Sequence, residues 1–177
     1  MTAQLSALRI EAGTWQVSDS RTQVGFTATN FGRPVRGSVA CSFGQVEIGD
    51  GGAPVRVYTE LDLASLATGI AKRDADLRKP RLLDIDRHPV MRWTAERFSP
   101  TADGGWTADG VLSVRGTTAP LAVTGAVDSV DLAGEWMRVR ADGVIDRTAV
   151  GIRAPSVLIG RSVAVRIDAW LVRTHSG

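Results

Sequence analysis

Short stretches of alternating apolar and polar residues, separated by turn sequences, run along almost the whole of this 177-residue chain. In the clearest one, Val55 to Leu63, every second side chain would lie on the same face of a strand. Asp50-Gly51-Gly52 and Asp103-Gly104-Gly105 are typical of hairpin turns. Strands are expected at 14–17, 23–29, 35–43 continued by 46–48, 55–63, 90–98, 106–114, 119–127, 137–145 and 163–172. About nine strands without a long amphipathic helix predict an antiparallel all-β barrel or sandwich.

The segment from Ser65 to Trp93 does not follow the strand pattern. It carries seven basic residues against four acidic ones, with Leu and Ile side chains between the charges. This predicts a short helical insert at residues 70–88, as one or two helices, with Pro80 opening the second because Pro is tolerated at the first helical position. Two interpretations are open: a lid over a cavity, or a plug that merely closes one end of a barrel.

The composition is that of one globular domain, because 44% of the residues are apolar and 23% are charged. We expect a flexible arm at 1–13 and a single domain at 14–173. The first residues lack the basic and apolar regions of a secretory signal, and no apolar run could span a membrane, which predicts a cytoplasmic protein without stable membrane insertion. The net charge is only +2 and the basic residues are spread singly, so no nucleic-acid partner is expected.

The inward-facing rows of three predicted strands are apolar but rich in Gly and Ala. These rows are Trp106, Ala108, Gly110, Leu112 and Val114; Ala119, Leu121, Val123, Gly125 and Val127; and Met137, Val139, Ala141, Gly143 and Ile145. Small inward side chains leave volume unoccupied, and an eight-stranded barrel has just enough interior to hold one small ligand. The pattern favours a hollow barrel; the alternative is a barrel filled by Trp15, Trp93, Trp106, Trp136 or Trp170.

Residues with catalytic or metal-binding chemistry are scarce, and we assign none of them a catalytic role. Cys41 is the only cysteine, and His88 and His175 are the only histidines, so neither a metal site nor a cofactor is expected. Two alternatives stay open. One is a Cys41–His88 nucleophilic pair, and the other is an enzyme that acts on an apolar substrate through Asp74, Asp76 or His88.

Several short motifs follow one another along the chain in a recognisable order. They are Ser65–Gly69 (SLATG), Lys72-Arg73-Asp74, Leu77-Arg78, Pro80, Leu82-Leu83-Asp84, His88-Pro89, Gly110-Val111-Leu112, Val114-Arg115-Gly116-Thr117, and Ile145-Asp146-Arg147 with Gly151. From Trp15 to Leu171 the chain thus resembles the YceI-like family of lipocalin-like barrels. The resemblance implies an antiparallel barrel of about eight strands that encloses a long apolar pocket beneath a helical insert.

The resemblance also implies a binding protein rather than an enzyme. Its partner would be a long-chain apolar small molecule, such as a polyisoprenoid, an isoprenoid quinone or a fatty-acyl lipid, which it carries or sequesters. Several family members dimerise, so a homodimer is a further expectation. Members often carry His at the positions of Asp19, Asn30 and Asp76, and Phe-Phe at Leu82-Leu83, so no haem or metal role is carried over to this chain.

The residues expected to contact the ligand come from the insert and from inward-facing strand positions. Arg73 and Asp74 are expected beside the pocket mouth, where Arg73 or Arg78 would pair with a charged head group. Leu77, Leu82 and Leu83 are expected to line or roof the pocket. The full set is Phe26, Leu61, Leu63, Leu66, Arg73, Asp74, Leu77, Leu82, Leu83, Ile85, Met91, Trp93, Ala108, Gly110 and Leu112.

Overall fold

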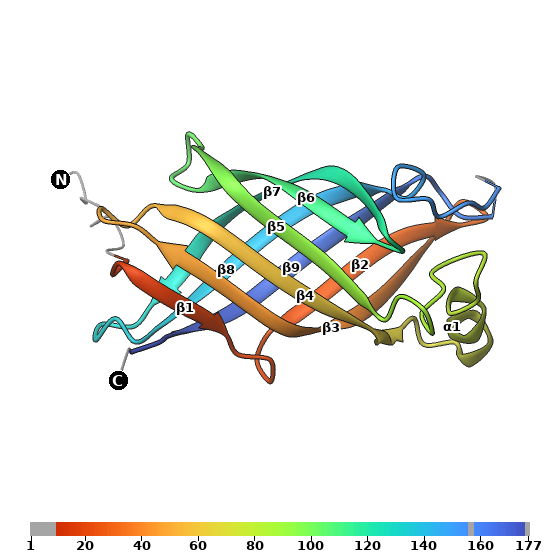
Figure 1. Ribbon diagram of the computed structural model, residues 1–177, viewed down its shortest axis with the longest axis horizontal. Helices are drawn as coiled ribbons and strands as arrows, with labels where there is room; N and C mark the ends of the chain where they lie inside the picture. Colours follow the sequence, from red (N-terminus) through yellow and green to blue (C-terminus); the bar gives the residue numbers. More distant parts are fainter. Residues whose placement is uncertain (1–9, 156–157, 176–177) are drawn as a thin grey trace.

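The computed structural model describes residues 10–155 and 158–175, and nine antiparallel strands form one sheet in the described chain (Figure 1). The strands are β1 Gly13–Val17, β2 Gln23–Asn30, β3 Arg33–Ile48, β4 Pro54–Ala67, β5 Val90–Pro100, β6 Trp106–Val114, β7 Thr117–Val130, β8 Trp136–Asp146 and β9 Ser162–Arg173. Their order is β1-β3-β2-β9-β8-β7-β6-β5-β4, and β4 pairs with β3 to close a barrel of eight strands, β2 to β9. The predicted all-β barrel is confirmed, and the sandwich is excluded.

The ninth strand, β1, lies beside this barrel because β3 is long and bent. The first half of β3 pairs with β2, and its second half pairs with β1, which also pairs with the end of β9. Register shifts between Ser38 and Ala40 and between Cys41 and Phe43 lie between these halves. Such irregularities bend a strand without ending it. The two segments expected at 35–43 and 46–48 are therefore one continuous strand.

The expected inward face of β4 is correct except at its start. Val57 to Leu63 alternate as predicted, but Val55 is 48% exposed, and Pro54 faces the interior in its place. The cause is a register shift: Glu47 pairs with Arg56, whereas the next residue of β3, Ile48, pairs with Pro54. One extra residue on β4 at this point turns Val55 outward.

The insert is expected to form one or two short helices, and one forms. Helix α1 covers Ala71–Leu77, and the prediction of a second helix opened by Pro80 is wrong, because residues 78–87 form consecutive turns. The N–H of Leu83 donates to the carbonyl of Leu77 at 3.1 Å, which folds the chain back onto the end of α1. A helix would spread Leu82, Leu83 and Ile85 over about 160° of its surface, whereas the turns bury all three.

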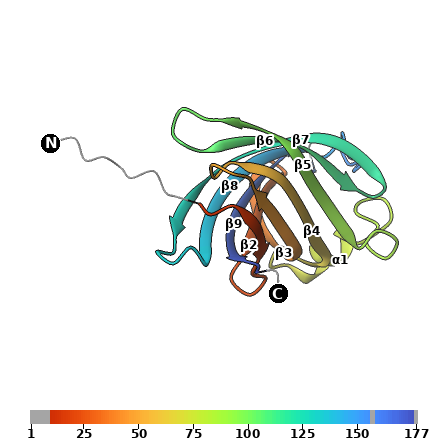
Figure 2. The same cartoon turned by 60° about the vertical axis from the view of Figure 1, so that its left-hand side comes forward.

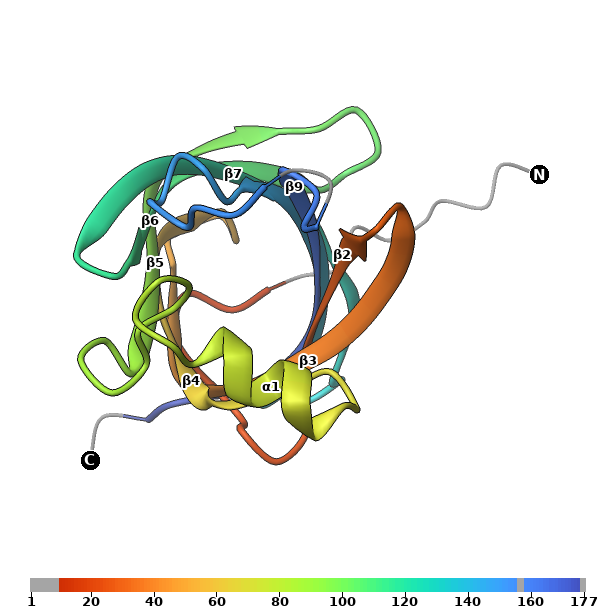
Figure 3. The ribbon, with the colours of Figure 1, turned by 90° about the vertical axis from the view of Figure 1, so that its right-hand side faces the viewer.

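Four segments lie together at one end of the barrel, which we call the insert end (Figure 1). They are the β2–β3 turn (30–36), the insert between β4 and β5 (67–90), the β6–β7 turn (114–117) and the β8–β9 loop (146–162). Viewed from this end, α1 lies across one side of the ring of strands and the β8–β9 loop across another (Figure 3). Beneath the insert, Leu83 and Ile85 form a core cluster with Leu112, Val114 and Val150.

The other end of the barrel carries β1 and the described parts of both chain ends (Figure 2). Trp15 of β1 is fully buried there, and it packs in a cluster with Ile48, Met137 and Leu171. Its indole N–H donates to the Glu11 carbonyl at 3.0 Å. This end of the barrel thus has its own apolar core around the Trp15 indole. Most of the arm expected at 1–13 lies outside the described residues.

Candidate functional site

An apolar cavity of about 360 Å³ runs along the inside of the barrel. Leu82 and Ile152 line it at the insert end, and Ile48 and Trp106 line it at the opposite end. On β9 the lining extends from Val163 to Leu171, about 26 Å along the strand at the usual rise of 3.3 Å per residue. The volume falls within the range of ligand pockets, about 300–1,000 Å³.

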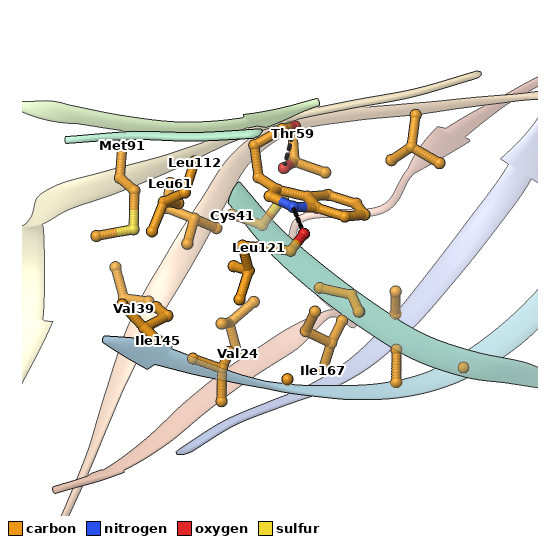
Figure 4. A pocket seen from close by; sticks show the side chains of 18 of the residues that line it. Val24, Val39, Cys41, Thr59, Leu61, Met91, Leu112, Leu121, Ile145 and Ile167 are labelled. Atoms are coloured by element: carbon orange, nitrogen blue, oxygen red, sulfur yellow. Dashed lines mark hydrogen bonds between the residues drawn. The ribbon is translucent and has the colours of Figure 1, made fainter. Parts of the chain in front are cut away.

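Every strand of the barrel contributes alternate residues to the wall, as the period of a strand requires. Figure 4 shows Met91, Leu112 and Ile145 pointing into the cavity from different strands. The small residues of the predicted rows also face the cavity, among them Ala108, Gly125, Ala141 and Gly143. The predicted hollow barrel is confirmed, and the alternative of a barrel filled by Trp side chains is wrong.

The five Trp side chains explain why the interior stays open. Trp136 and Trp170 contact each other outside the barrel, with ring centroids 5.2 Å apart and ring planes tilted by 42°. Trp15 is buried in the core cluster at the end opposite the insert, and Trp106 lies in the cavity wall. Trp93 lies in the wall too, and its indole N–H donates to the Leu121 carbonyl at 3.0 Å (Figure 4).

Most of the residues expected to contact a ligand line this cavity. They are Phe26, Leu61, Leu63, Leu66, Leu77, Leu82, Leu83, Met91, Trp93, Ala108 and Leu112. The three leucines of the insert form the roof at one end, as expected. The lid interpretation of the insert is therefore favoured over a mere plug, because its apolar side chains are part of the cavity wall.

Four expected contacts do not line the cavity. Ile85 is buried on the inner side of the insert, where it packs with Leu63 and Val150. Gly110 is covered by Trp93: a Cβ atom built on Gly110 would lie 2.4 Å from the indole nitrogen. The small residue at 110 therefore makes room for an indole and not for a ligand. The other two, Arg73 and Asp74, are polar.

Arg73 and Asp74 both bind Thr68, the residue that follows β4. The Asp74 carboxylate accepts hydrogen bonds from the Thr68 N–H at 3.0 Å and from its hydroxyl. Arg73 donates to the Thr68 hydroxyl at 2.7 Å and to its carbonyl at 2.9 Å. We call this set of bonds the Thr68 latch. These bonds hold both side chains against the start of the insert, and neither side chain lines the cavity. Contact of Arg73 or Asp74 with a ligand at the pocket mouth stays a prediction.

Only two titratable side chains line the cavity among the described residues, Cys41 and Arg147. Burial is the main cause that raises the pKa of the Cys41 thiol, which donates to the Phe43 carbonyl at 3.3 Å. A thiol with a raised pKa is a poor nucleophile at neutral pH, because the thiolate is the reactive form. Cys41 is therefore an apolar element of the wall rather than half of a catalytic pair with His88.

Arg147 is a site residue that the sequence reasoning did not identify. Its side chain is 2% exposed and lies at the insert end of the cavity. The guanidinium donates to the carbonyls of Ile152, Ala154, Ile159 and Gly160 at 2.6–3.2 Å. It thus organises the β8–β9 loop, and no carboxylate among the described residues neutralises it. The sequence does contain a signal for this residue: Arg147 occupies the next inward-facing position after the apolar row of β8.

The residues of the alternative catalytic hypothesis lie outside the cavity. Asp76 forms an ion pair with Lys79 at 2.7 Å, which lowers its pKa, and Asp74 belongs to the Thr68 latch. His88 lies in the turn before β5 and is absent from the wall. In the described part of the chain, no three His, Cys, Asp or Glu side chains are placed to hold a metal ion. No described helix is long and apolar enough to cross a membrane.

Comparisons with known proteins agree with this architecture. The fold matches BcnA of Burkholderia cenocepacia with a TM-score of 0.78 at 15% identity, over 87% of this chain and 98% of that one. It matches a polyisoprenoid binding domain of Saccharophagus degradans, implicated in plant cell wall breakdown, with a TM-score of 0.69 at 12% identity, over 93% and 100% of the chains. The YceI protein of Campylobacter jejuni gives 0.67 at 13% identity, over 95% and 89%.

At these identities the structural matches show a shared fold and nothing about the ligand. No curated protein sequence matches this chain. The model of the YceI-like domain, however, matches residues 15–171, which is the span over which the sequence motifs resemble that family. The chain belongs to the YceI-like family.

Proposed function

We propose that this protein binds one long, unbranched or isoprenoid apolar molecule inside the barrel, and carries or sequesters it. The single observation that supports this best is the cavity itself. Its wall is almost entirely apolar, and Cys41, Arg147, Thr22 and Thr59 are the only described lining residues with a thiol, a charged group or a hydroxyl. The YceI-like fold supports binding of an apolar ligand in general, and a neighbour of the same fold is described as a polyisoprenoid binding domain.

The energy of binding would come from removing the ligand chain from water. Each buried methylene contributes about 0.8 kcal/mol, so ten of them contribute about 8 kcal/mol. A single exposed ion pair contributes about 0–1 kcal/mol. The wall can therefore provide affinity without a specific polar contact, and chain length should affect the affinity more than the head group does.

The shape of the cavity favours chain-like ligands over compact ones. The lining on β9 is about 26 Å long, while the cavity holds about 360 Å³, so the space is long and narrow. Polyisoprenoid, isoprenoid quinone and fatty-acyl molecules all have this form. An enzyme that uses this cavity is a weaker alternative, because the Asp74, Asp76 and His88 side chains do not reach it.

The test is to purify the protein, extract it with organic solvent and identify what is released by mass spectrometry. A delipidated sample is then titrated with fatty acids and isoprenoid alcohols of increasing length, with an apolar fluorophore as the competitor. We expect affinity to rise about three- to four-fold for each added methylene until the cavity is full. Affinity that does not change with chain length, or no uptake of any of these molecules, would refute the proposal.

A matched pair of variants ties this binding to the interior. Ala141 lies in the cavity wall and is partly accessible from the lumen, whereas Ala122 lies on the outer face of the neighbouring strand β7. We expect Ala141→Phe to weaken binding of the longest ligands at least ten-fold, because the ring occupies their space. Ala122→Phe introduces the same ring outside and should leave the affinity unchanged. Circular dichroism of both variants checks that the barrel is folded.

A further inference from the structure

Folding gathers basic residues that are scattered along the sequence at one end of the barrel. The four segments of the insert end contain 12 of the 21 Lys and Arg residues but only 5 of the 19 Asp and Glu residues. The rest of the chain has 9 basic and 14 acidic residues, so the small net charge of +2 conceals a strong polarity along the barrel axis. The basic residues are spread singly along the sequence, but the folded barrel concentrates them at the insert end.

Many of these cations are available to a partner. Arg33, Arg36, Lys72, Arg81, Arg87 and Arg153 are exposed, and none of them has an ion pair or a side-chain hydrogen bond within the described structure. They come from three of the four segments, so the positive charge surrounds the end of the barrel rather than following one element (Figure 3). Such a ring of cations attracts an extended anionic surface.

Apolar side chains project from the same end. Phe31 is 67% exposed, Ile70 is 52% exposed and Leu158 is 37% exposed. Phe31 is the most unusual, because it occupies the first position of a two-residue hairpin turn with a φ of 49°. Asn and Gly are the residues that favour this left-handed conformation, and a bulky side chain is strained there. An exposed aromatic ring held in a strained turn is a reason to look for a function.

These apolar tips lie on neighbouring segments. Asn30, next to Phe31, forms a β-bridge with Ile159, next to Leu158, and the Gly160 N–H donates to the Thr29 carbonyl at 3.0 Å. Phe31 and Arg73 line a common surface hollow with Arg33 and Pro34, which brings the β2–β3 turn beside α1. Apolar tips and free cations thus share one face.

From this combination we propose that the insert end docks reversibly on an anionic phospholipid bilayer. The free cations bind the lipid phosphates, and Phe31, Ile70 and Leu158 enter the interface between head groups and acyl chains. Peripheral binding of stable strength usually needs both signals, apolar insertion and electrostatic attraction. A nucleic acid would use the cations but would not explain apolar side chains on separate segments. The proposal does not depend on what the barrel contains.

The test is sedimentation or flotation of the full chain with vesicles of phosphatidylcholine alone and vesicles that contain about one third phosphatidylglycerol. We expect binding to the anionic vesicles only, and a loss of binding as salt is raised. Phe31→Asn should weaken it about ten-fold while the hairpin becomes no less stable, because Asn suits the turn. Arg33→Glu should weaken it at least five-fold.

Matched controls lie away from the insert end. Leu132 is fully exposed in the β7–β8 turn, at the opposite end, so Leu132→Asn removes an exposed apolar side chain without touching the proposed surface. Arg97 is exposed in the half of β5 that is distant from the insert, so Arg97→Glu makes the same charge change elsewhere. Both should retain vesicle binding. The proposal is overturned if the two controls lose vesicle binding as much as the test variants do. It is also overturned if the protein binds duplex DNA more tightly than anionic vesicles and Phe31→Asn has no effect.

Discussion

The indole of Trp93 lies over Gly110, in the space that a side chain at position 110 would fill. A Cβ atom there would be 2.4 Å from the indole nitrogen and 2.5 Å from its neighbouring ring carbon. From this position the indole N–H reaches across β6 to the Leu121 carbonyl on β7, at 3.0 Å. A large side chain is thereby laid flat along the wall, and the interior remains open.

We therefore predict that Gly110→Ala destabilises the barrel. The new methyl group must displace the indole or the backbone, and overpacking of this kind costs about 1–3 kcal/mol. Chemical denaturation measures the loss, and a changed Trp emission reports the moved ring. Gly25 provides the matched control, because its Cβ would meet only an ordinary contact at 3.7 Å, so Gly25→Ala should be neutral or slightly stabilising. Equal stability of the two variants would contradict the prediction.

The Thr68 latch predicts that the insert can be loosened without unfolding the barrel. Asp74→Ala removes the acceptor for two donors of Thr68, and a lost buried hydrogen bond costs about 1 kcal/mol. Amide exchange in residues 67–90 should become about five-fold faster or more, while exchange in β8 and β9 stays unchanged. Asp76→Ala removes only an exposed ion pair with Lys79 in the same insert, and it should have little effect.

Alternation is the part of this structure that the sequence predicts well. Side chains in a strand alternate strictly, and a slip by one residue would turn an entire apolar row to solvent. The inward-facing rows on β6, β7 and β8, which include Ala108 and Ala141, can therefore be predicted from the alternation alone. The same reasoning fails at Val55, because a bulge in the pairing with β3 is not visible in β4 itself.

What the sequence does not predict depends on how the chain folds back on itself, over short separations as well as long ones. In the sequence, Gly110 indicates unoccupied space in the cavity, but the register of β5 and β6 places Trp93 over it. The residue type of Arg147 suggests an exposed side chain, but in the structure the β8–β9 loop folds around its guanidinium. Arg73 and Asp74 appear in the sequence as free head-group ligands, but in the structure Thr68 donates to Asp74 and accepts from Arg73. In each case the local pattern shows the chemistry of the residue, and only the folded chain shows which groups it contacts.

Arg147 is expected to be essential for the order of the β8–β9 loop. Arg147→Met has a similar apolar stem but leaves several buried carbonyls without a donor, each at a cost of about 1–3 kcal/mol. We expect a large loss of stability in denaturant and rapid proteolysis within residues 147–160. Arg153→Met, on the same loop but exposed, should change stability by no more than about 0.5 kcal/mol. A stable, protease-resistant Arg147→Met protein would show that the loop is held by other contacts.

Cys41 offers a probe of the cavity from within, because its thiol is part of the wall. Burial raises the pKa of this thiol, so the folded protein holds its proton to higher pH than the unfolded chain does. Its contribution to stability is therefore complete below the unfolded pKa and is lost as the pH rises through the folded one. The rate of modification by a small neutral thiol reagent should be slow near pH 8 in the folded protein. It should keep rising with pH after the rate for the unfolded chain has reached its plateau. A bound long-chain ligand should slow the reaction further. Rapid modification at neutral pH that a bound ligand does not slow would mean that Cys41 is reached from outside the barrel, and that the cavity does not hold the ligand beside it.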